Sequence, residues 1–275
     1  MNNEKRRRAR VQGGWCPPTN VRSDKDKPKS QPCPAWTNKT VDNPQSKNFT
    51  FEEPEEVRMK PPEKVLSKSG VYDLSETSNG LSRIRLFTDF FKSDQADWMF
   101  EQLLDELPWK QRSHRFQSEK YLEPRLTAWY GELPYTYSGT TLQPNPEWSP
   151  ALQVIKQQLE ERTGYTFNSM LANLYRDGHD SIDWHSDDEK SLGPAPVIAS
   201  LSFGDSRNFE LRKKPPTAEN GDYTYMEHVR VPVTHGCLII MEGATQADWQ
   251  HRVPKEYHDR DPRINLTFRV IYSES

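Results

Sequence analysis

Two stretches of the chain repeat apolar residues at the spacing of an amphipathic α-helix. The first follows Ser93, a candidate N-cap; the second follows Ser149, with Pro150 at its first position and Gly164 at its end. Their apolar stripes are Ala96, Met99, Phe100, Leu103, Leu104 and Leu107, and then Leu152, Ile155 and Leu159. Both patterns are typical of helices that pack on a core, and neither indicates chemistry.

Short extended segments separated by turn residues hold most of the other apolar positions. We expect strands at 82–87, 126–131, 169–175, 197–203, 208–213, 225–231, 237–242 and 264–272. Strands of this length and spacing predict a sandwich or barrel. The expected fold class is therefore mainly β with flanking helices (α+β), most economically a double-sheet jelly roll whose outer face carries the two helices.

Polar side chains recur on one face of several segments, because alternate residues of a strand share a face. The last segment has Arg263, Asn265, Thr267 and Arg269 on one side and Ile264, Leu266 and Phe268 on the other. The simplest interpretation is an ordinary half-buried strand whose polar face meets solvent. Asn173 and Tyr175 share a face in the same way, as do His185 and Asp187.

His185 and Asp187 supply two ligands of a possible facial metal site, and His251 is the best candidate for the third. Two histidines and one carboxylate leave coordination positions open, which suits non-haem Fe(II) and oxygen activation. Two arginines on one strand face, with an Asn and a Tyr nearby, are what a dicarboxylate requires. We expect the remaining histidines at the surface: His114, His179, His228, His235 and His258.

Charge divides the chain into two parts. Its 275 residues include 37 Lys or Arg and 40 Asp or Glu, a net charge of −3. Residues 1–50 carry 11 basic and 4 acidic residues, a balance of +7, which leaves −10 on the rest. We predict a disordered, basic, proline-bearing N-terminal region at 1–65 and one domain at 66–275. The cluster Lys5–Arg10 could be a nuclear-import signal, a nucleic-acid contact or a solvated charged end.

Several classes of protein are excluded by composition. No apolar run approaches the ~20 residues that span a bilayer, and the first residues are not those of a signal peptide. Cys16, Cys33 and Cys237 are too widely spaced for a disulfide framework or a zinc site. A chain of net charge −3 is not expected to coat duplex DNA, although a local basic groove remains possible.

Four motifs resemble those of the AlkB family of Fe(II)/2-oxoglutarate-dependent nucleic-acid dealkylases, in order and spacing. They are Asn173-Leu174-Tyr175, His185-Ser186-Asp187-Asp188-Glu189, Trp249-Gln250-His251-Arg252-Val253-Pro254, and the alternating Arg263, Asn265, Thr267 and Arg269. The resemblance spans roughly residues 65–275 and implies a double-stranded β-helix dioxygenase core with a nucleotide-recognition lid at about 110–140.

By that resemblance, His185, Asp187 and His251 are the catalytic Fe(II) ligands. The co-substrate 2-oxoglutarate would be held by Arg263 and Tyr175 at its distal carboxylate and by Arg269 and Asn173 near the metal. The implied reaction uses O2, with ascorbate as reductant. It hydroxylates the N-methyl group of 1-methyladenine or 3-methylcytosine in single-stranded DNA and RNA, releasing formaldehyde, succinate and CO2.

Recognition of a base needs aromatic planes and polar contacts near the metal, since a base reaches a buried iron only by leaving its stack. Candidate substrate residues are Tyr137, Tyr121, Tyr135, Glu189, Leu171 and Arg125. Glu189 matches the family position that faces the exocyclic amino group, whereas Leu171 has plain core packing as its alternative, and so does Trp129. Lid cations that could contact phosphates are Lys110, Arg112, Arg115, Lys120 and Arg125, and Arg212, Lys213 and Lys214 form a second basic spot.

Two other functions fit part of this pattern. A 2-oxoglutarate-dependent hydroxylase of a protein or small molecule would share the metal and co-substrate residues, and a non-catalytic nucleic-acid-binding scaffold would not need them. The family resemblance further implies single-stranded nucleic acid and a helicase-containing coactivator complex, the activating signal cointegrator complex, as partners. We expect a monomer in the nucleus and cytoplasm with no membrane association.

Overall fold

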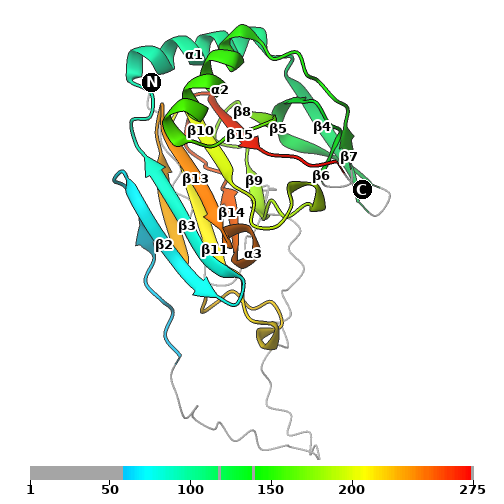
Figure 1. Cartoon of the computed structure of the whole chain (residues 1–275). Helices are drawn as coiled ribbons and strands as arrows, with labels where there is room; N and C mark the ends of the chain where they lie inside the picture. The colour runs from blue at the N-terminus through cyan, green and yellow to red at the C-terminus, as the bar shows by residue number, and fades with distance from the viewer. Residues whose placement is uncertain (1–57, 117–118, 138–139, 274–275) are drawn as a thin grey trace, which may run out of the picture. The chain divides into compact units, whose positions relative to one another are not determined.

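The computed structural model of the chain describes residues 58–116, 119–137 and 140–273 (Figure 1). Side chains at 114–120 and 137 are likewise outside the description. Most of the predicted N-terminal region, with its basic cluster and two of the three cysteines, therefore lies outside the described residues. Within them, no helix is long and apolar enough to cross a membrane.

Two large β-sheets and a small hairpin make up the body of the domain (Figure 1). The eight-stranded sheet has the order β2 (Gly70–Thr77), β3 (Gly80–Phe87), β13 (Leu238–Gly243), β10 (Ile198–Gly204), β15 (Arg263–Arg269), β8 (Ser169–Tyr175), β5 (Glu119–Gly131) and β4 (Lys110–Phe116). The five-stranded sheet has the order β1 (Lys64–Val65), β12 (His228–Val233), β11 (Arg207–Lys213), β14 (Trp249–Val253) and β9 (Ile182–His185). The hairpin pairs β6 (Tyr135–Tyr137) with β7 (Thr140–Leu142). The predicted mainly β fold with a jelly-roll core is confirmed.

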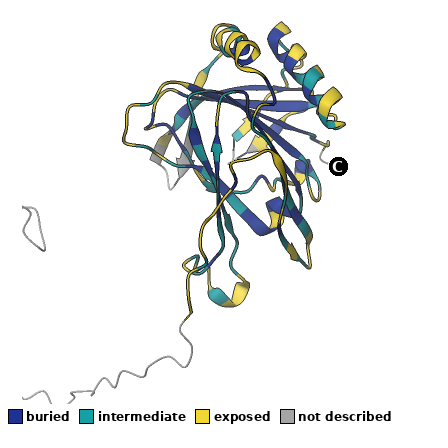
Figure 2. Ribbon diagram, turned by 90° about the vertical axis from the view of Figure 1, so that its left-hand side faces the viewer, coloured by how far each residue is buried: buried dark blue, intermediate teal, exposed yellow. Residues whose placement is uncertain are grey.

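Apolar side chains fill two layers, one on each side of the larger sheet. Its outer face packs against α1 (Ser93–Glu106) and α2 (Pro150–Thr163), as predicted, and the outward sides of both helices are exposed (Figure 2). The layer on the inner face of the larger sheet joins Ile84, Leu86, Ile198 and Ile239 to Phe209, Leu211, Val229 and Val231 of the smaller sheet. Burying each such side chain stabilises the fold by about 1.5–3 kcal/mol.

The helix boundaries follow local capping chemistry. The Ser149 hydroxyl accepts a hydrogen bond from the Leu152 amide, and Gly164 closes α2 with a φ of 77°, as its sequence predicts. The predicted cap of α1 is wrong by one residue. Ser93 is already helical, and Lys92 is the N-cap, its amide donating to the Gln95 side chain. The apolar stripe of a helix does not determine its first residue.

Most predicted strands are confirmed to within three residues at each end, and β8 coincides with its prediction. The prediction did not include β9 and β14, whose sequences IDWH and WQHRV are short and rich in polar residues. These two strands belong to the smaller sheet and lie side by side in it. Both candidate histidine ligands therefore lie on strands that the prediction did not include.

The simplest interpretation of β15 taken alone, an ordinary strand with a solvated polar face, is wrong. All seven residues of the strand are buried, and its polar side chains line a cavity between the sheets. Internal hydrogen bonds satisfy part of this face: Asn265 Nδ2 donates to the Ser200 hydroxyl at 2.8 Å, and Thr267 Oγ1 donates to Asn265 Oδ1 at 2.9 Å. Polar groups are tolerated there because they find partners.

Candidate metal centre

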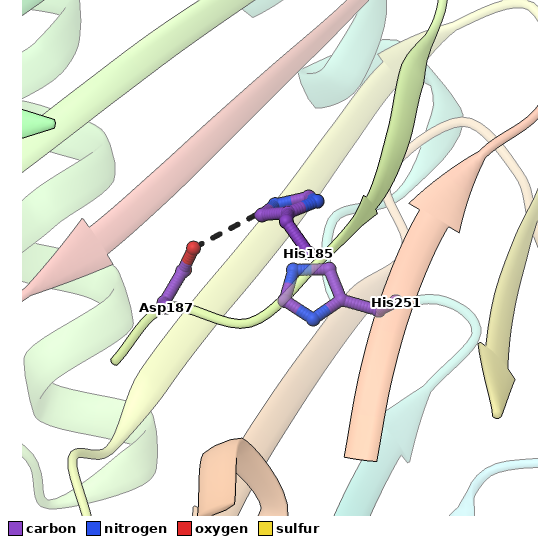
Figure 3. A group of neighbouring side chains, drawn as sticks. All are labelled: His185, Asp187 and His251. Carbon is purple, nitrogen blue, oxygen red and sulfur yellow. Dashed lines mark ion pairs between the residues drawn. The ribbon is translucent and has the colours of Figure 1, made fainter. Parts of the chain in front are cut away.

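Strand pairing brings the two histidines together. His251 on β14 is directly opposite His185 on β9, and their ring centroids lie 4.2 Å apart. Asp187 follows β9 by two residues and turns its carboxylate toward the rings, with Oδ1 3.7 Å from His185 Nε2 (Figure 3). One potential ligand atom from each of the three residues lies within 4.8 Å of the others. The structure thus places the predicted triad in one cluster.

The protonation states of the cluster suit a divalent cation. Burial, together with the neighbouring His185, lowers the pKa of His251 to about 3. Burial also lowers the pKa of His185, so both imidazoles are neutral and keep a lone pair for a metal. Burial alone acts to raise the pKa of Asp187, but the charge of Arg269 and its hydrogen bonds to the carboxylate hold that pKa well below its usual range. The carboxylate is therefore ionised.

The orientation of the His185 ring is also set by the chain. Its Nδ1 lies 2.7 Å from the main-chain carbonyl oxygen of Asp183, a contact that assigns the N–H to Nδ1. Nε2, the atom nearest to Asp187, is then the free ligand atom. Two neutral histidines and one carboxylate form the donor set of facial Fe(II) sites, and the residues present fit that ion.

A cradle for a carboxylate ligand lies beside the triad. Asn173, Tyr175, Arg263 and Arg269 line the same inner cavity as the three metal-ligand candidates. Register explains this: β8 and β15 are antiparallel neighbours, and Arg263 pairs with Tyr175. Leu171 also lines the cavity, as predicted from its position two residues before Asn173.

The guanidinium groups of the cradle have unused donors. Arg263 is 1% exposed, and its Nη2 donates to the Ser202 hydroxyl at 2.9 Å. Its Nε and Nη1, and Nη1 of Arg269, are buried without a hydrogen-bond partner among the described residues. An unpaired buried donor costs about 1–3 kcal/mol, and more when charged, so the cradle fits a ligand that carries carboxylates. A dicarboxylate such as 2-oxoglutarate satisfies that condition.

An open cleft of about 790 Å³ leads outward from this cavity and shares Arg125, Ile182, His185 and Val253 with it. Tyr121, which is 51% exposed, and Glu189 line the cleft. Burial, together with the charge of Asp187, raises the pKa of Glu189, and its Oε2 has no hydrogen-bond partner in the described part of the chain. Tyr121 is therefore accessible to a molecule that enters the cleft, whereas Glu189 is half-buried and its Oε2 is shielded from solvent.

Two candidate substrate residues occupy unexpected environments. Arg125 is 4% exposed and donates through Nε to Asn173 Oδ1 at 2.9 Å, so it lies too deep for the predicted phosphate contact. Tyr135 is 1% exposed and stacks on Trp129 with 4.9 Å between ring centroids, so it presents no open face to a base. The third lid aromatic, Tyr137, has its side chain outside the description.

The basic residues predicted to meet phosphates are mostly engaged or lie outside the description. Arg112 donates to Thr127 Oγ1, whereas the Arg115 and Lys120 side chains are not described. In the second basic spot, the Arg212 guanidinium lies 4.4 Å from the centroid of the Trp184 ring, and Lys213 pairs with Glu227.

Four further residues that line the cleft were not predicted: Trp184, Arg252, Lys255 and Tyr257. Trp184 precedes His185 on β9, and Arg252 follows His251 on β14. Because neighbouring residues of a strand point to opposite faces, recognising these strands would have placed Trp184 and Arg252 on the face away from the histidines. Tyr257 is in the loop after β14 and 84% exposed, and no periodic pattern marks it.

A jelly roll that encloses a His–Asp–His cluster beside two buried arginines defines a class, the oxygenases that use Fe(II) and 2-oxoglutarate. Comparison with known proteins agrees, since the family described as the 2OG-Fe(II) oxygenase superfamily matches residues 83–269. That range contains all the metal and co-substrate candidates.

Individual proteins with similar sequences show which members of this class the chain resembles. The chain is 54% identical over 279 residues to alpha-ketoglutarate-dependent dioxygenase alkB homolog 3 of Homo sapiens, covering 98% of this chain and 97% of that protein. The Mus musculus protein of the same name is 54% identical over 284 residues, with the same coverage. DNA oxidative demethylase ALKBH2 of Homo sapiens is 39% identical over 190 residues, covering 67% of this chain and 72% of that protein.

The chain belongs to the AlkB family of 2OG-Fe(II) oxygenases. The predictions of an Fe(II)/2-oxoglutarate-dependent dioxygenase, and of Fe(II), 2-oxoglutarate and O2 as its requirements, are therefore confirmed.

Proposed function

We propose that this dioxygenase is an oxidative demethylase that repairs 1-methyladenine and 3-methylcytosine in single-stranded DNA and RNA. The observation that carries the proposal is the open cleft, which is lined by the metal-ligand candidate His185 and by Tyr121 and Glu189. A relative that covers most of the domain is named a DNA oxidative demethylase, which supports a methylated nucleic acid as substrate.

When bound, Fe(II) and 2-oxoglutarate supply an oxidation in which O2 converts 2-oxoglutarate to succinate and CO2 and places one oxygen atom in a methyl C–H bond. The resulting N-hydroxymethyl base breaks its C–N bond, releasing formaldehyde and the restored base. Ascorbate would serve as reductant. In this proposal His185, Asp187 and His251 hold the metal.

The chain's own residues position the co-substrate. Arg263 and Tyr175 would bind its distal carboxylate, because two donor nitrogens of Arg263 are unused and its guanidinium carbon lies 5.1 Å from the Tyr175 ring centroid. Arg269 and Asn173 would contact the end nearer the metal. Burial of all four residues excludes water from the reacting groups, which strengthens each charged contact.

Residues that line the cleft would recognise the base. Glu189 Oε2 has no hydrogen-bond partner within the described residues and can accept from an exocyclic amino group, which 1-methyladenine and 3-methylcytosine both carry. The exposed ring of Tyr121 offers a stacking surface. A single strand suits this geometry, because extruding one unpaired base costs less than opening a duplex.

The test incubates the protein with Fe(II), 2-oxoglutarate, ascorbate and methylated oligonucleotides, single- and double-stranded, DNA and RNA, and follows methyl loss by mass spectrometry. We expect methyl loss with stoichiometric succinate, faster on single strands, and none in His185→Ala or Asp187→Ala. No methyl loss on any strand, with 2-oxoglutarate bound, would overturn the proposal. Substrate-dependent succinate formation with a peptide or small molecule instead would favour the alternative hydroxylase. The coactivator-complex partner, monomeric state and nuclear and cytoplasmic location stay predictions.

A further inference from the structure

The main-chain amide of Asp187 forms a hydrogen bond with a side chain from the segment between β13 and β14. The Asp187 amide donates to Oε1 of Gln246 at 2.9 Å. Gln246 belongs to α3 (Thr245–Asp248), the short helix that leads directly into β14 and His251. The Gln246 residue is only 2% exposed, so this contact is shielded from water.

The Gln246 amide has one sensible orientation. Its Nε2 donates to the sulfur of Met241 at 3.3 Å, which leaves Oε1 as the acceptor for the Asp187 amide. A thioether sulfur accepts a hydrogen bond only weakly, whereas the amide of Asp187 needs a strong acceptor once buried. The main stabilising role of the side chain is therefore toward Asp187.

The helix that carries Gln246 is itself anchored. The carboxylate of Asp248 accepts hydrogen bonds from Thr77 and Asn79 in the β2–β3 hairpin, both at 2.7 Å. Lys214 Nζ donates to the Gln246 carbonyl at 3.0 Å and lies 3.7 Å from the Asp188 carboxylate. These contacts give Gln246 a rigid base from which to hold the loop after β9.

We propose that Gln246 is a positioning residue for the metal centre: it fixes the main chain of Asp187 while Arg269 fixes the carboxylate. The two ligand-bearing segments, the loop after β9 and the start of β14, are tied through it and through Ser186 Oγ, which donates to the Trp249 carbonyl at 2.9 Å. Without the Gln246 acceptor, the Asp187 amide is buried unpaired and the loop shifts to satisfy it. This role concerns metal retention and is independent of which substrate the enzyme demethylates.

The test compares Gln246→Met, which removes the acceptor at similar length, with Gln246→Glu, which keeps an acceptor at the same position. Gln250→Met is the matched control. Gln250 also has an amide side chain and is next to His251, but it lies on the opposite face of β14, where it accepts a hydrogen bond from Arg212. Co(II) binding is titrated by its ligand-field absorption. The apparent constants for Fe(II) and 2-oxoglutarate, the concentrations that give half-maximal activity, are measured separately with the demethylation substrate or by uncoupled succinate formation.

We expect Gln246→Met to weaken Co(II) binding by about 10–100-fold, the range for partners of metal ligands, and to alter the absorption band. The apparent constant for Fe(II) should rise with little change in that for 2-oxoglutarate. Gln246→Glu should restore most of the affinity, and Gln250→Met should match the wild type. Wild-type Co(II) binding in Gln246→Met, or equal losses in both Met variants, would overturn the proposal. If Gln246→Met does not fold, the same Co(II) titration is carried out with Gln246→Asn, whose side-chain amide is one methylene too short for the Asp187 amide.

Discussion

Arg269 donates two hydrogen bonds to one oxygen of the Asp187 carboxylate, from Nη2 at 2.8 Å and from Nε at 3.2 Å to Oδ2. The other oxygen, Oδ1, is the one that faces His185. The third guanidinium nitrogen, Nη1, has no hydrogen-bond partner among the described residues. One arginine thus orients a metal-ligand candidate and keeps a donor for the co-substrate, so the two sites are physically coupled.

Replacing Arg269 by Met should destabilise the metal-free protein. Both partners are buried, and removing one leaves an uncompensated carboxylate, which costs about 3–5 kcal/mol. Urea unfolding of the metal-free variant measures this loss. The control is Arg252→Met, which breaks a half-exposed pair with Glu210 at 2.7 Å and should cost about 1 kcal/mol or less. Equal losses in the two variants would contradict the assigned role of burial.

Replacing Arg263 by Lys should weaken 2-oxoglutarate binding selectively. Lysine cannot replace the two donor nitrogens that Arg263 leaves unused. A hydrogen bond to a charged group contributes about 1.5–3 kcal/mol, or about 10-fold or more in affinity. Succinate formation against 2-oxoglutarate concentration gives the apparent constant, and Co(II) titration should be unchanged. Arg230→Lys, in an exposed pair with Glu63, is the control. A parallel loss of metal affinity would argue for a general structural effect.

Acid should destabilise the protein partly through Asp180. Burial acts to raise the pKa of this carboxyl, but hydrogen bonds from the side chain and amide of Arg176 outweigh it, and the pKa is lowered. The folded pKa is then below the unfolded value of about 3.9, so the carboxylate stabilises the fold above about pH 4. That contribution disappears as the pH falls through the folded pKa.

Asp180→Asn should therefore flatten the acid limb of a plot of unfolding free energy against pH, measured by urea unfolding. Asp259→Asn serves as control, because Asp259 is an exposed carboxylate in the loop after β14. An unchanged acid limb in Asp180→Asn would show that other carboxylates dominate acid unfolding.

Tyr257→Ala should weaken binding of single-stranded oligonucleotides if the cleft receives nucleic acid as proposed. The ring is 84% exposed at the cleft, and stacking of one base on an aromatic ring contributes about 1–3 kcal/mol. Fluorescence anisotropy measures this binding with strands of increasing length. The loss of affinity should appear only with the longer strands. Tyr272→Ala is the control, because Tyr272 is 59% exposed but lines a different cavity. Equal binding by both variants would remove Tyr257 from the interface.

Local sequence signals were sufficient wherever the chemistry is local. The Ser149 cap, Pro150 and Gly164 predict both ends of α2, because capping hydrogen bonds join residues a few positions apart. The motif resemblance, carried by residues in four short segments, led to the family and to its metal-ligand candidates. The contact between Asp187 and Gln246 had no such signal, since it joins residues 59 positions apart through a main-chain amide.

The sequence by itself determined which side chains share a strand face, because alternation along a strand follows from backbone geometry. It therefore grouped Arg263 with Arg269 and separated them from Ile264 and Leu266. Only the tertiary structure decided that the polar face of β15 is interior, because which side of a strand is covered depends on the second sheet and the helices that pack against it. The same packing turned an apparently solvated row of polar residues into a buried cradle beside the metal centre.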